Sequence, residues 1–236
     1  MPYTLDSHRY VSPNYDNRPS GTVVDAIVIH TTEGRWPSDA EWLCNPDAGV
    51  SCHYVIPPTG TIVYRLVPDG RRAWHAGTSS YAGRSNWNNF SIGVEVSHMQ
   101  GDAWPAGQHD MLAALCRKLI DSYPIEEVNI AAHRWVAPDR KIDPTDWPDS
   151  DFKAWIAGLY TPTIIRYRIT SPCAVLNARA GDAPPAAGPD NGQTWLSVGD
   201  VINGESQPEG GFLWVSDDEF NPPGIGFVPA SYAERL

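Results

Sequence analysis

The segment from Val23 to His30 constrains the fold most, because it is almost entirely apolar and rich in β-branched residues. It ends at His30 and is followed by the polar, turn-like residues 31–34. A short apolar run bounded by turn residues is typical of a strand that is buried within a sheet. The segment therefore predicts a central buried strand whose polar end is available for function.

Elements of both kinds follow this strand. Apolar residues recur at helical spacing between Gln108 and Tyr123, whereas a Pro- and Gly-containing turn at 57–60 separates two strand-like segments and predicts a hairpin. The predicted helices span 38–44 and 108–123, and the predicted strands span 51–56, 61–66, 91–96 and 128–132. Because strands and helices alternate, we expect an α/β fold with a mixed central sheet flanked by helices.

The character of the chain changes after residue 158, where Gly and Pro become frequent and helical spacing disappears. Short apolar runs separated by turn residues are typical of a small all-β domain. The candidate strands are 165–169, 175–178, 194–201, 212–216 and 226–228. With the boundary near residues 160–163, the sequence predicts one domain over 1–160 and a small barrel over 164–236.

Charge and hydropathy limit the partners of the chain. The formal net charge is -11, and the Lys and Arg residues form no concentrated basic stretch, which argues against binding to nucleic acid. No apolar segment is long enough for membrane insertion. The N-terminus lacks the basic leader and apolar run of a signal peptide, which predicts synthesis in the cytoplasm. A monomer is expected.

The cysteines, at positions 44, 52, 116 and 173, include no CxxC pair. This spacing argues against a thiolate zinc cluster and against a disulfide-dense scaffold, so buried free thiols are expected. A bond between Cys44 and Cys52 stays open as an alternative, because a sequence does not give the geometry that a disulfide requires.

Three residues suit a hydrolytic zinc site, which needs imidazole and carboxylate ligands and an open position for water or substrate. His30 ends the central strand, His133 follows the strand predicted at 128–132, and Asp143 lies ten residues further along. The ends of adjacent strands can bring such side chains together. No local motif such as HExxH marks the site, and a structural role is the alternative for each histidine taken alone.

Five segments of the chain occur in the order found in a known family. They are Ile27–Gly34, Val50–Ile56, Arg72–Gly77, Asn89–Glu95, and His133–Arg134 with Arg140–Pro144. In these segments the chain resembles the type 2 N-acetylmuramoyl-L-alanine amidases, relatives of the peptidoglycan recognition proteins, over most of residues 20–157. The resemblance implies cleavage of the bond between the lactyl group of N-acetylmuramic acid and the L-alanine of a peptidoglycan stem peptide.

The same resemblance implies roles for individual residues. His30, His133 and Asp143 correspond to the ligands of Zn²⁺, and Glu95 and Lys141 to catalytic residues. A carboxylate at the end of a buried strand can take a proton from the attacking water, and a cation beside Asp143 can stabilise the negative charge that develops on the amide oxygen. The alternatives are a carboxylate satisfied by hydrogen bonds and a solvated surface lysine.

One position departs from part of the family. Some relatives have a tyrosine near the metal where this chain has Cys52. The difference points to the branch in which a glutamate, here Glu95, acts instead. Packing roles are expected for Cys52, His53 and Tyr54.

The segment 78–88 is polar and aromatic, and no regular structure is expected in it. Loops of this kind often carry recognition. Tyr81 and Trp87 are predicted to stack on sugar rings. Arg84 is predicted to bind a carboxylate of the stem peptide, which its planar guanidinium suits. His75 is predicted to line the substrate cleft, with a structural role as the alternative, and is not counted as a zinc ligand.

The second domain resembles the bacterial SH3-like modules that bind cell walls. The matching segments are 176–181, 196–200, 211–215 and 226–229. The resemblance implies bacterial peptidoglycan as the partner, because such a module concentrates an enzyme at its insoluble substrate. A structural β-domain is the alternative.

Two domains without a signal peptide fit a phage endolysin that reaches the cell wall after holin-type release. A bacterial autolysin fits an amidase as well. The alternatives from other classes are a non-catalytic peptidoglycan-binding protein and a zinc peptidase that cuts within the stem peptide. Retention of all three metal ligands argues against the pure binder, which has no need of an open metal position.

Overall fold

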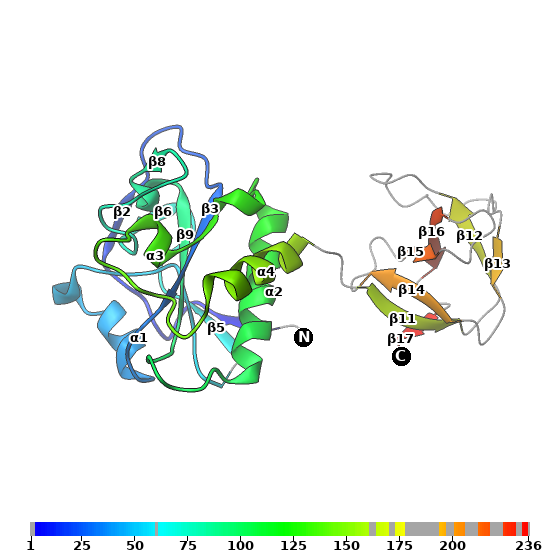
Figure 1. Ribbon diagram of the computed structural model, residues 1–236, viewed down its shortest axis with the longest axis horizontal. Helices are drawn as coiled ribbons and strands as arrows, with labels where there is room; N and C mark the ends of the chain where they lie inside the picture. Colours follow the sequence, from blue (N-terminus) through cyan, green and yellow to red (C-terminus); the bar gives the residue numbers. More distant parts are fainter. Residues whose placement is uncertain are drawn as a thin grey trace. The chain divides into compact units, whose positions relative to one another are not determined.

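The first unit of the chain, Met1–Tyr160, is built on a mixed sheet with the strand order β1-β5-β4-β9-β3-β10 (Figure 1). Its strands are β1 (Thr4–Asp6), β3 (Ala26–Thr31), β4 (Tyr54–Ile56), β5 (Ile62–Arg65), β9 (Ser91–Val96) and β10 (Ile130–Ala132). β3 pairs in parallel with β9 and β10, whereas β4 and β5 form an antiparallel hairpin. The predicted α/β fold with a mixed central sheet is confirmed.

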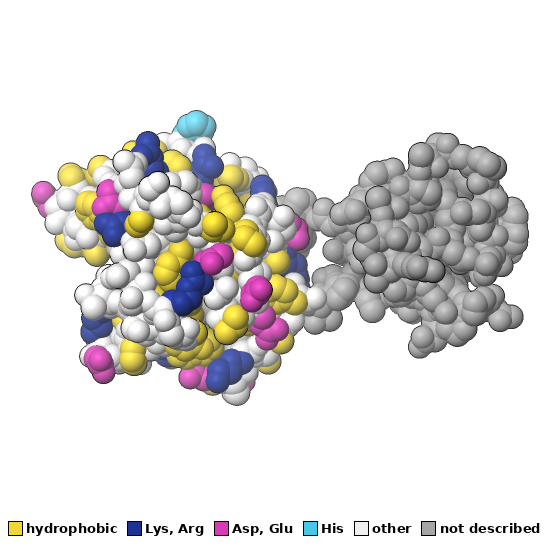
Figure 2. Space-filling model, turned by 90° about the horizontal axis from the view of Figure 1, so that it is seen from above, with side chains coloured by type: hydrophobic (Ala, Val, Ile, Leu, Met, Phe, Trp, Pro, Cys, Tyr) yellow, Lys and Arg dark blue, Asp and Glu magenta, His cyan; other side chains and the backbone are white. Residues whose placement is uncertain are grey.

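The computed structural model describes residues 3–59, 61–160, 164–169, 173–177, 194–196, 201–205, 212–217, 224–229 and 233–235. None of the helices in these segments has the length and apolar character that crossing a bilayer requires. On the face shown in Figure 2, acidic and basic side chains of the first unit are interspersed with apolar ones.

Two long helices, α2 (Ala106–Ser122) and α4 (Asp149–Tyr160), contribute to the main core of this unit. Leu112 and Leu115 of α2 and Phe152 of α4 are fully or almost fully buried in one cluster with the sheet. The extended backbone of Tyr123 ends α2, as expected for a residue that precedes a proline. The helix predicted at 108–123 is therefore confirmed, whereas α4 was not predicted.

Shorter elements complete the unit. They are the helices α1 (Ser38–Leu43) and α3 (His133–Val136), the 3₁₀ turns Pro46–Ala48, Trp87–Asn89 and Glu127–Asn129, and the strand pairs β2 (Tyr15–Asn17) with β6 (Arg71–Ala73) and β7 (Ser80–Tyr81) with β8 (Arg84–Ser85). The expectation of no regular structure in 78–88 was wrong, because β7 and β8 form a short hairpin there.

The residues of β3 alternate between the two faces of the sheet, as the period of a strand requires. Ile27 and Ile29 belong to the core that α2 and α4 cover, whereas Ala26 and Val28 pack in a second cluster that contains Trp87. His30 continues the second set. Its side chain therefore emerges on the face opposite the long helices.

Arg18 connects the segment that precedes β3 to the rest of the unit through hydrogen bonds. Its guanidinium donates hydrogen bonds to the backbone carbonyls of Asp69, Asn88, Asn89 and Ser91 at 2.8–3.1 Å. Burial lowers the pKa of Arg18 to about 10, so the side chain stays charged near neutral pH. The clamp fixes the start of β9, the strand that carries Glu95.

The second unit, Thr161–Leu236, contains strands only in its described residues. The strands are β11 (Ile164–Ile169), β12 (Cys173–Asn177), β13 (Thr194–Leu196), β14 (Val201–Glu205), β15 (Phe212–Asp217), β16 (Gly224–Pro229) and β17 (Ala233–Arg235). They pair in the order β13-β12-β16-β15-β14-β11-β17, with antiparallel neighbours throughout. The segment predicted as one strand at 194–201 contains the strand 194–196, and 197–200 lie outside the described residues.

Cys44, Cys52 and Cys116 are free thiols, so Cys44 and Cys52 are not bonded to each other. The side chain of Cys173 lies outside the described part of the chain. Cys52 and Tyr54 are buried in the core, as expected for packing roles.

Candidate metal centre

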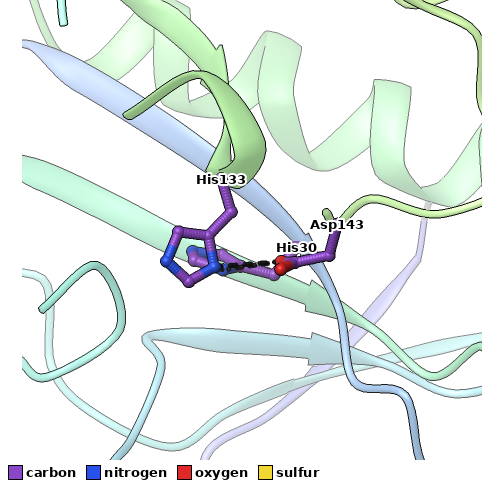
Figure 3. A group of neighbouring side chains, drawn as sticks. All are labelled: His30, His133 and Asp143. Carbon is purple, nitrogen blue, oxygen red and sulfur yellow. Dashed lines mark hydrogen bonds and ion pairs between the residues drawn. The ribbon is translucent and has the colours of Figure 1, made fainter. Parts of the chain in front are cut away.

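Three side chains from distant parts of the sequence point toward one another at the end of β3 (Figure 3). The Nδ1 atoms of His30 and His133 are 2.8 Å apart. The Oδ2 atom of Asp143 lies 3.3 Å from Nδ1 of His30 and 3.0 Å from Nδ1 of His133. All three residues are buried. The structure thus brings together the three residues that the sequence predicted as metal ligands.

The sheet and two backbone contacts determine this convergence. His133 directly follows β10, and β10 pairs in parallel with β3, so the ends of both strands lie side by side. The segment carrying Asp143 is held at both ends, since the Arg134 amide donates to the Asp143 carbonyl at 2.8 Å and the Thr145 amide donates to Oγ1 of Thr31 at 3.1 Å. The backbone that carries this carboxylate is therefore held by hydrogen bonds at Asp143 and at Thr145.

Glu33 reinforces the same arrangement. Its Oε1 atom accepts hydrogen bonds from the hydroxyls of Thr31 and Thr145, and its Oε2 atom accepts one from the Gln100 amide. One carboxylate thus joins the end of β3, the Asp143 segment and the loop after β9. The sequence gives no indication of this role of Glu33, because an acidic residue in a turn carries no signal of such distant partners.

The donor set fits a zinc ion. Ligands about 2.0–2.1 Å from a tetrahedral zinc lie about 3.3 Å from one another. The three separations of 2.8, 3.0 and 3.3 Å come close to this spacing before any adjustment. Two imidazoles and one carboxylate also leave one position of a tetrahedron for water or substrate, which is the composition of hydrolytic zinc sites.

The surroundings favour the protonation states that metal binding needs. Burial lowers the pKa of His30 to about 4, so its imidazole is neutral near neutral pH. Burial alone would favour the neutral acid at Asp143, but the contacts of its carboxylate with His133 and His30 lower its pKa well below the ordinary value. A neutral imidazole and an ionised carboxylate are the forms that bind metals.

Glu95 lies beside the three donors. Its Oε1 atom is 3.9 Å from Nδ1 of His30, and its Oε2 atom is buried with no hydrogen-bond partner in the described chain. Burial raises the pKa of Glu95 well above its ordinary value, and the charge of Asp143 adds to the rise. The charge of Lys141 acts in the opposite direction.

A cavity of about 380 Å³ adjoins Glu95. It is lined by Thr32, Glu33, Gly34, Arg35, Ser38, Asp39, Trp42, Leu43 and Glu95. Trp42 is 55% exposed there, which is unusual for so large an apolar side chain. Nothing in the sequence distinguished Trp42 from the nine other tryptophans, since helical position alone does not reveal which aromatic rings face solvent.

The substrate contacts predicted from segment 78–88 need correction. Trp87 is fully buried in the core, so its ring is not available to stack on a sugar. Arg84 binds Asp25 at 2.8 Å, and its guanidinium lies 3.7 Å from the centre of the Phe90 ring. This pairing leaves it poorly suited to a substrate carboxylate. Tyr81 is partly exposed and packs against Trp87 and Trp135.

The prediction that His75 lines the substrate cleft also needs correction. Only 7% of this residue is exposed. Its ring lies behind His30, with Nδ1 of His75 at 3.1 Å from Nε2 of His30. Burial lowers the pKa of His75 well below its ordinary value, so the ring is neutral. His75 therefore contacts a metal-ligand candidate and does not line the cavity beside Glu95.

Comparisons with known proteins agree with this site. The family model described as N-acetylmuramoyl-L-alanine amidase matches residues 20–146. The 1,6-anhydro-N-acetylmuramyl-L-alanine amidase AmpD of Salmonella typhimurium (strain SL1344) is 38% identical over 177 residues, covering 66% of this chain and 92% of that protein. The N-acetylmuramoyl-L-alanine amidase AmiD of Escherichia coli (strain K12) is 32% identical over 158 residues, covering 60% of this chain and 54% of that protein.

Solved structures show the same relationship. A crystal structure of a selenomethionine derivative of AmpD superposes with a TM-score of 0.54 at 32% identity, covering 67% of this chain and 94% of the other. The crystal structure of AmpDh3 from Pseudomonas aeruginosa gives 0.51 at 26% identity, covering 64% and 67%. Since the match to the family model spans more than half of the chain and includes His30, His133 and Asp143, this protein belongs to the N-acetylmuramoyl-L-alanine amidase family.

Proposed function

We propose that the chain is a zinc-dependent hydrolase that cleaves the amide bond between N-acetylmuramic acid and L-alanine in bacterial peptidoglycan. The observation that carries the proposal is the convergence of one oxygen and two nitrogen donors within 3.3 Å of one another, next to a partly buried glutamate. A zinc ion held by His30, His133 and Asp143 would polarise the amide carbonyl and make a water molecule more acidic.

Glu95 takes the proton of the attacking water. Burial raises its pKa above that of an ordinary carboxylic acid, which strengthens it as a proton acceptor. The same group can then deliver the proton to the leaving nitrogen of L-alanine. Oε2 of Glu95 has no hydrogen-bond partner in the described chain, so no protein donor competes with the proton of the water for this atom.

Lys141 stabilises the negative charge on the carbonyl oxygen. The residue lies two positions before Asp143 in the segment that Glu33 and Thr31 hold in place. Burial dominates the pKa shifts of His30 and Glu95, and the positive charge of Lys141 acts on both by favouring the neutral imidazole and the ionised carboxylate. A fixed cation at the point where charge develops lowers the barrier for attack on an amide.

The cavity beside Glu95 is the proposed entrance for substrate. Trp42 offers an exposed ring at its rim, and aromatic rings pack well against the apolar faces of sugars. Arg35 lies on the same rim and is largely exposed, with an ion pair to Asp102. These residues replace Trp87 and Arg84 as the proposed substrate contacts.

The second unit is proposed to be an SH3-like module that binds the cell wall. The motif resemblance in 176–229 and the antiparallel strands of this unit support the proposal. A wall-binding module keeps the hydrolase near an insoluble substrate. We further propose a monomer that acts on the wall as a phage endolysin after holin-type release, with a bacterial autolysin as the alternative setting.

A second candidate is action on a 1,6-anhydro-N-acetylmuramyl substrate. The 38% identity to the AmpD protein of Salmonella typhimurium, whose name specifies that substrate, favours it. Both candidates involve the same bond and the same residues. They differ in whether the muramyl group belongs to an intact wall or to a 1,6-anhydro fragment.

One experiment tests the function and separates these candidates. The full chain is incubated with purified sacculi and, separately, with 1,6-anhydro-muropeptides, and the products are identified by mass spectrometry. Free lactyl carboxylates together with intact stem peptides support amidase action, whereas peptides cut internally would indicate a peptidase. His30→Ala and Asp143→Ala should each abolish product release while the fold is retained. Full activity in both variants would refute the proposed metal site.

A further inference from the structure

A chain of hydrogen bonds runs from His30 into the interior of the protein. Nε2 of His30 lies 3.1 Å from Nδ1 of His75, and Nε2 of His75 lies 3.2 Å from Oγ of Ser91. Oγ of Ser91 lies 2.5 Å from the backbone carbonyl oxygen of Trp87. His75 and Ser91 are both buried, so water does not compete for these contacts.

The last member of the chain fixes the direction of every bond in it. A carbonyl oxygen only accepts, so the Ser91 hydroxyl must donate its one proton to Trp87. Oγ of Ser91 then accepts from Nε2–H of His75. A neutral imidazole protonated on Nε2 has a lone pair on Nδ1, and this lone pair accepts from Nε2–H of His30. His30 is left with its lone pair on Nδ1, the atom that faces His133 and Asp143.

The surrounding structure holds the His75 ring in this place. The backbone amides of His75 and Ala76 donate to Oδ1 of Asn88 at 3.1 and 2.7 Å. On the other side the ring lies against Gly93 of β9, where an added Cβ would come within 2.3 Å of Cγ of His75. Only glycine leaves room for the ring at that position.

His133 has no comparable support. Its Nε2 atom is buried and has no hydrogen-bond partner among the described residues. The two imidazoles that face each other across 2.8 Å are therefore held differently. One is connected through two side chains to a backbone carbonyl, and the other depends on its contacts at Nδ1.

We propose that His75 and Ser91 are positioning residues that hold His30 in the tautomer with a free lone pair on Nδ1, and thereby raise the affinity of the site for zinc. The proposal rests on the zinc site proposed above. It assigns a function to His75, for which the sequence left substrate contact and a structural role open. Hydrogen-bond partners of metal-ligating histidines typically change metal affinity by about 10–100-fold.

Two substitutions at one position provide the test. His75→Leu fills much of the space of the ring without an acceptor, whereas His75→Asn keeps an acceptor oxygen near the position of Nδ1. The zinc affinity of the full chain is measured with Zn²⁺ alone in competition with a chromophoric chelator. We expect His75→Leu to weaken binding about 10–100-fold, and His75→Asn to restore most of the affinity. Ser91→Ala should fall between His75→Leu and the unaltered chain.

Ser51→Ala is the matched control. Ser51 is buried, accepts from the Trp74 amide and donates to the Asn14 carbonyl, but takes no part in the chain to His30. Its loss should leave zinc affinity unchanged. Thermal unfolding of each variant shows whether the fold is retained. If His75→Leu and Ser91→Ala are folded and bind zinc as tightly as the unaltered chain, the proposal is wrong.

A second readout is independent of both folding energy and catalysis. Long-range ¹H–¹⁵N spectra of the metal-free protein report which ring nitrogen of His30 carries the proton. We expect Nε2–H in the unaltered chain and a mixture of tautomers in His75→Leu, whereas a predominant Nδ1–H form in the unaltered chain would overturn the proposal. Zinc binding without amide cleavage would refute the proposed function and leave the roles of His75 and Ser91 intact.

Discussion

His30 and Glu95 are direct partners in the register of the parallel strands β3 and β9. Paired residues of adjacent strands project from the same face of a sheet, so the two side chains lie together, with Oε1 of Glu95 at 3.9 Å from Nδ1 of His30. The register of one strand pair thus sets the separation between the proposed metal ligand and the proposed base. Neither residue depends on a mobile loop for its position.

Glu95→Gln should reduce the rate of amide cleavage and leave zinc binding intact. The amide cannot take a proton from water, and general base catalysis typically contributes about 10²–10⁴-fold. The three donors are unchanged, so zinc affinity should stay near that of the unaltered chain. Glu41→Gln, an exposed acid on α1, serves as control. A fully active Glu95→Gln variant would show that another group moves the proton.

The metal-free protein should lose stability as the pH falls from about 7 to about 5. Burial lowers the pKa of His30 from 6.5 to about 4 and that of His53 to about 3. At both histidines the unfolded chain binds more protons than the folded one over this interval, so their protonation favours unfolding. His30 alone should contribute on the order of 2 kcal/mol over this interval.

Urea denaturation of the metal-free protein at the two pH values measures this loss. In His30→Asn the same interval should show a smaller decrease in the free energy of unfolding. Equal stability of the unaltered chain at both pH values would contradict the prediction.

Arg84→Ala should lower stability without weakening substrate binding. The substitution removes a partly buried ion pair with Asp25 and a contact over the Phe90 ring, a loss of about 1–3 kcal/mol. Arg35→Ala removes an ion pair that is far more exposed, and should cost less than about 1 kcal/mol. Chemical denaturation measures the stability of both variants. The KM for muropeptides measures whether Arg84→Ala weakens substrate binding. A raised KM at unchanged stability would reinstate Arg84 as a substrate contact.

Trp42→Ala should raise the KM and leave the fold stable. The ring is 55% exposed at the cavity beside Glu95, so its removal leaves little space in the core. Loss of one stacking contact should raise the KM about three- to tenfold. Val23→Ala, another exposed apolar position, is the control. An unchanged KM would exclude Trp42 from substrate binding.

The sequence predicted the elements whose side chains follow a regular period. The apolar run that ends at His30 became the central strand β3, and the helical spacing after Gln108 became α2. Both patterns arise from burial on one side or both sides of an element, which a single sequence displays directly. The boundary at Val23 was too early, because Val23 is 58% exposed and precedes the strand.

Pairings between distant residues could not be predicted in this way. Arg84 forms an ion pair with Asp25, which lies 59 positions earlier in the sequence, and no local sequence pattern predicts such a partner. Trp87 occupies the core although it lies in a polar segment, since a residue without periodic neighbours gives no sign of which way it points. The grouping of His30, His133 and Asp143 came from resemblance to a family, because spacings of 103 and 10 residues follow no local rule.

The clamp made by Arg18 sets a practical limit on how this protein can be divided. A segment trimmed to residues 20–146, the span of the family match, would lose both Arg18 and the whole of α4. Loss of Arg18 would leave the carbonyls at the start of β9 without their hydrogen-bond donor. Loss of α4 would expose the core residues that pack around Phe152. A catalytic domain that is joined to a different targeting domain should therefore retain residues 3–160. The part of the chain needed for folding is longer than the part that matches the family model.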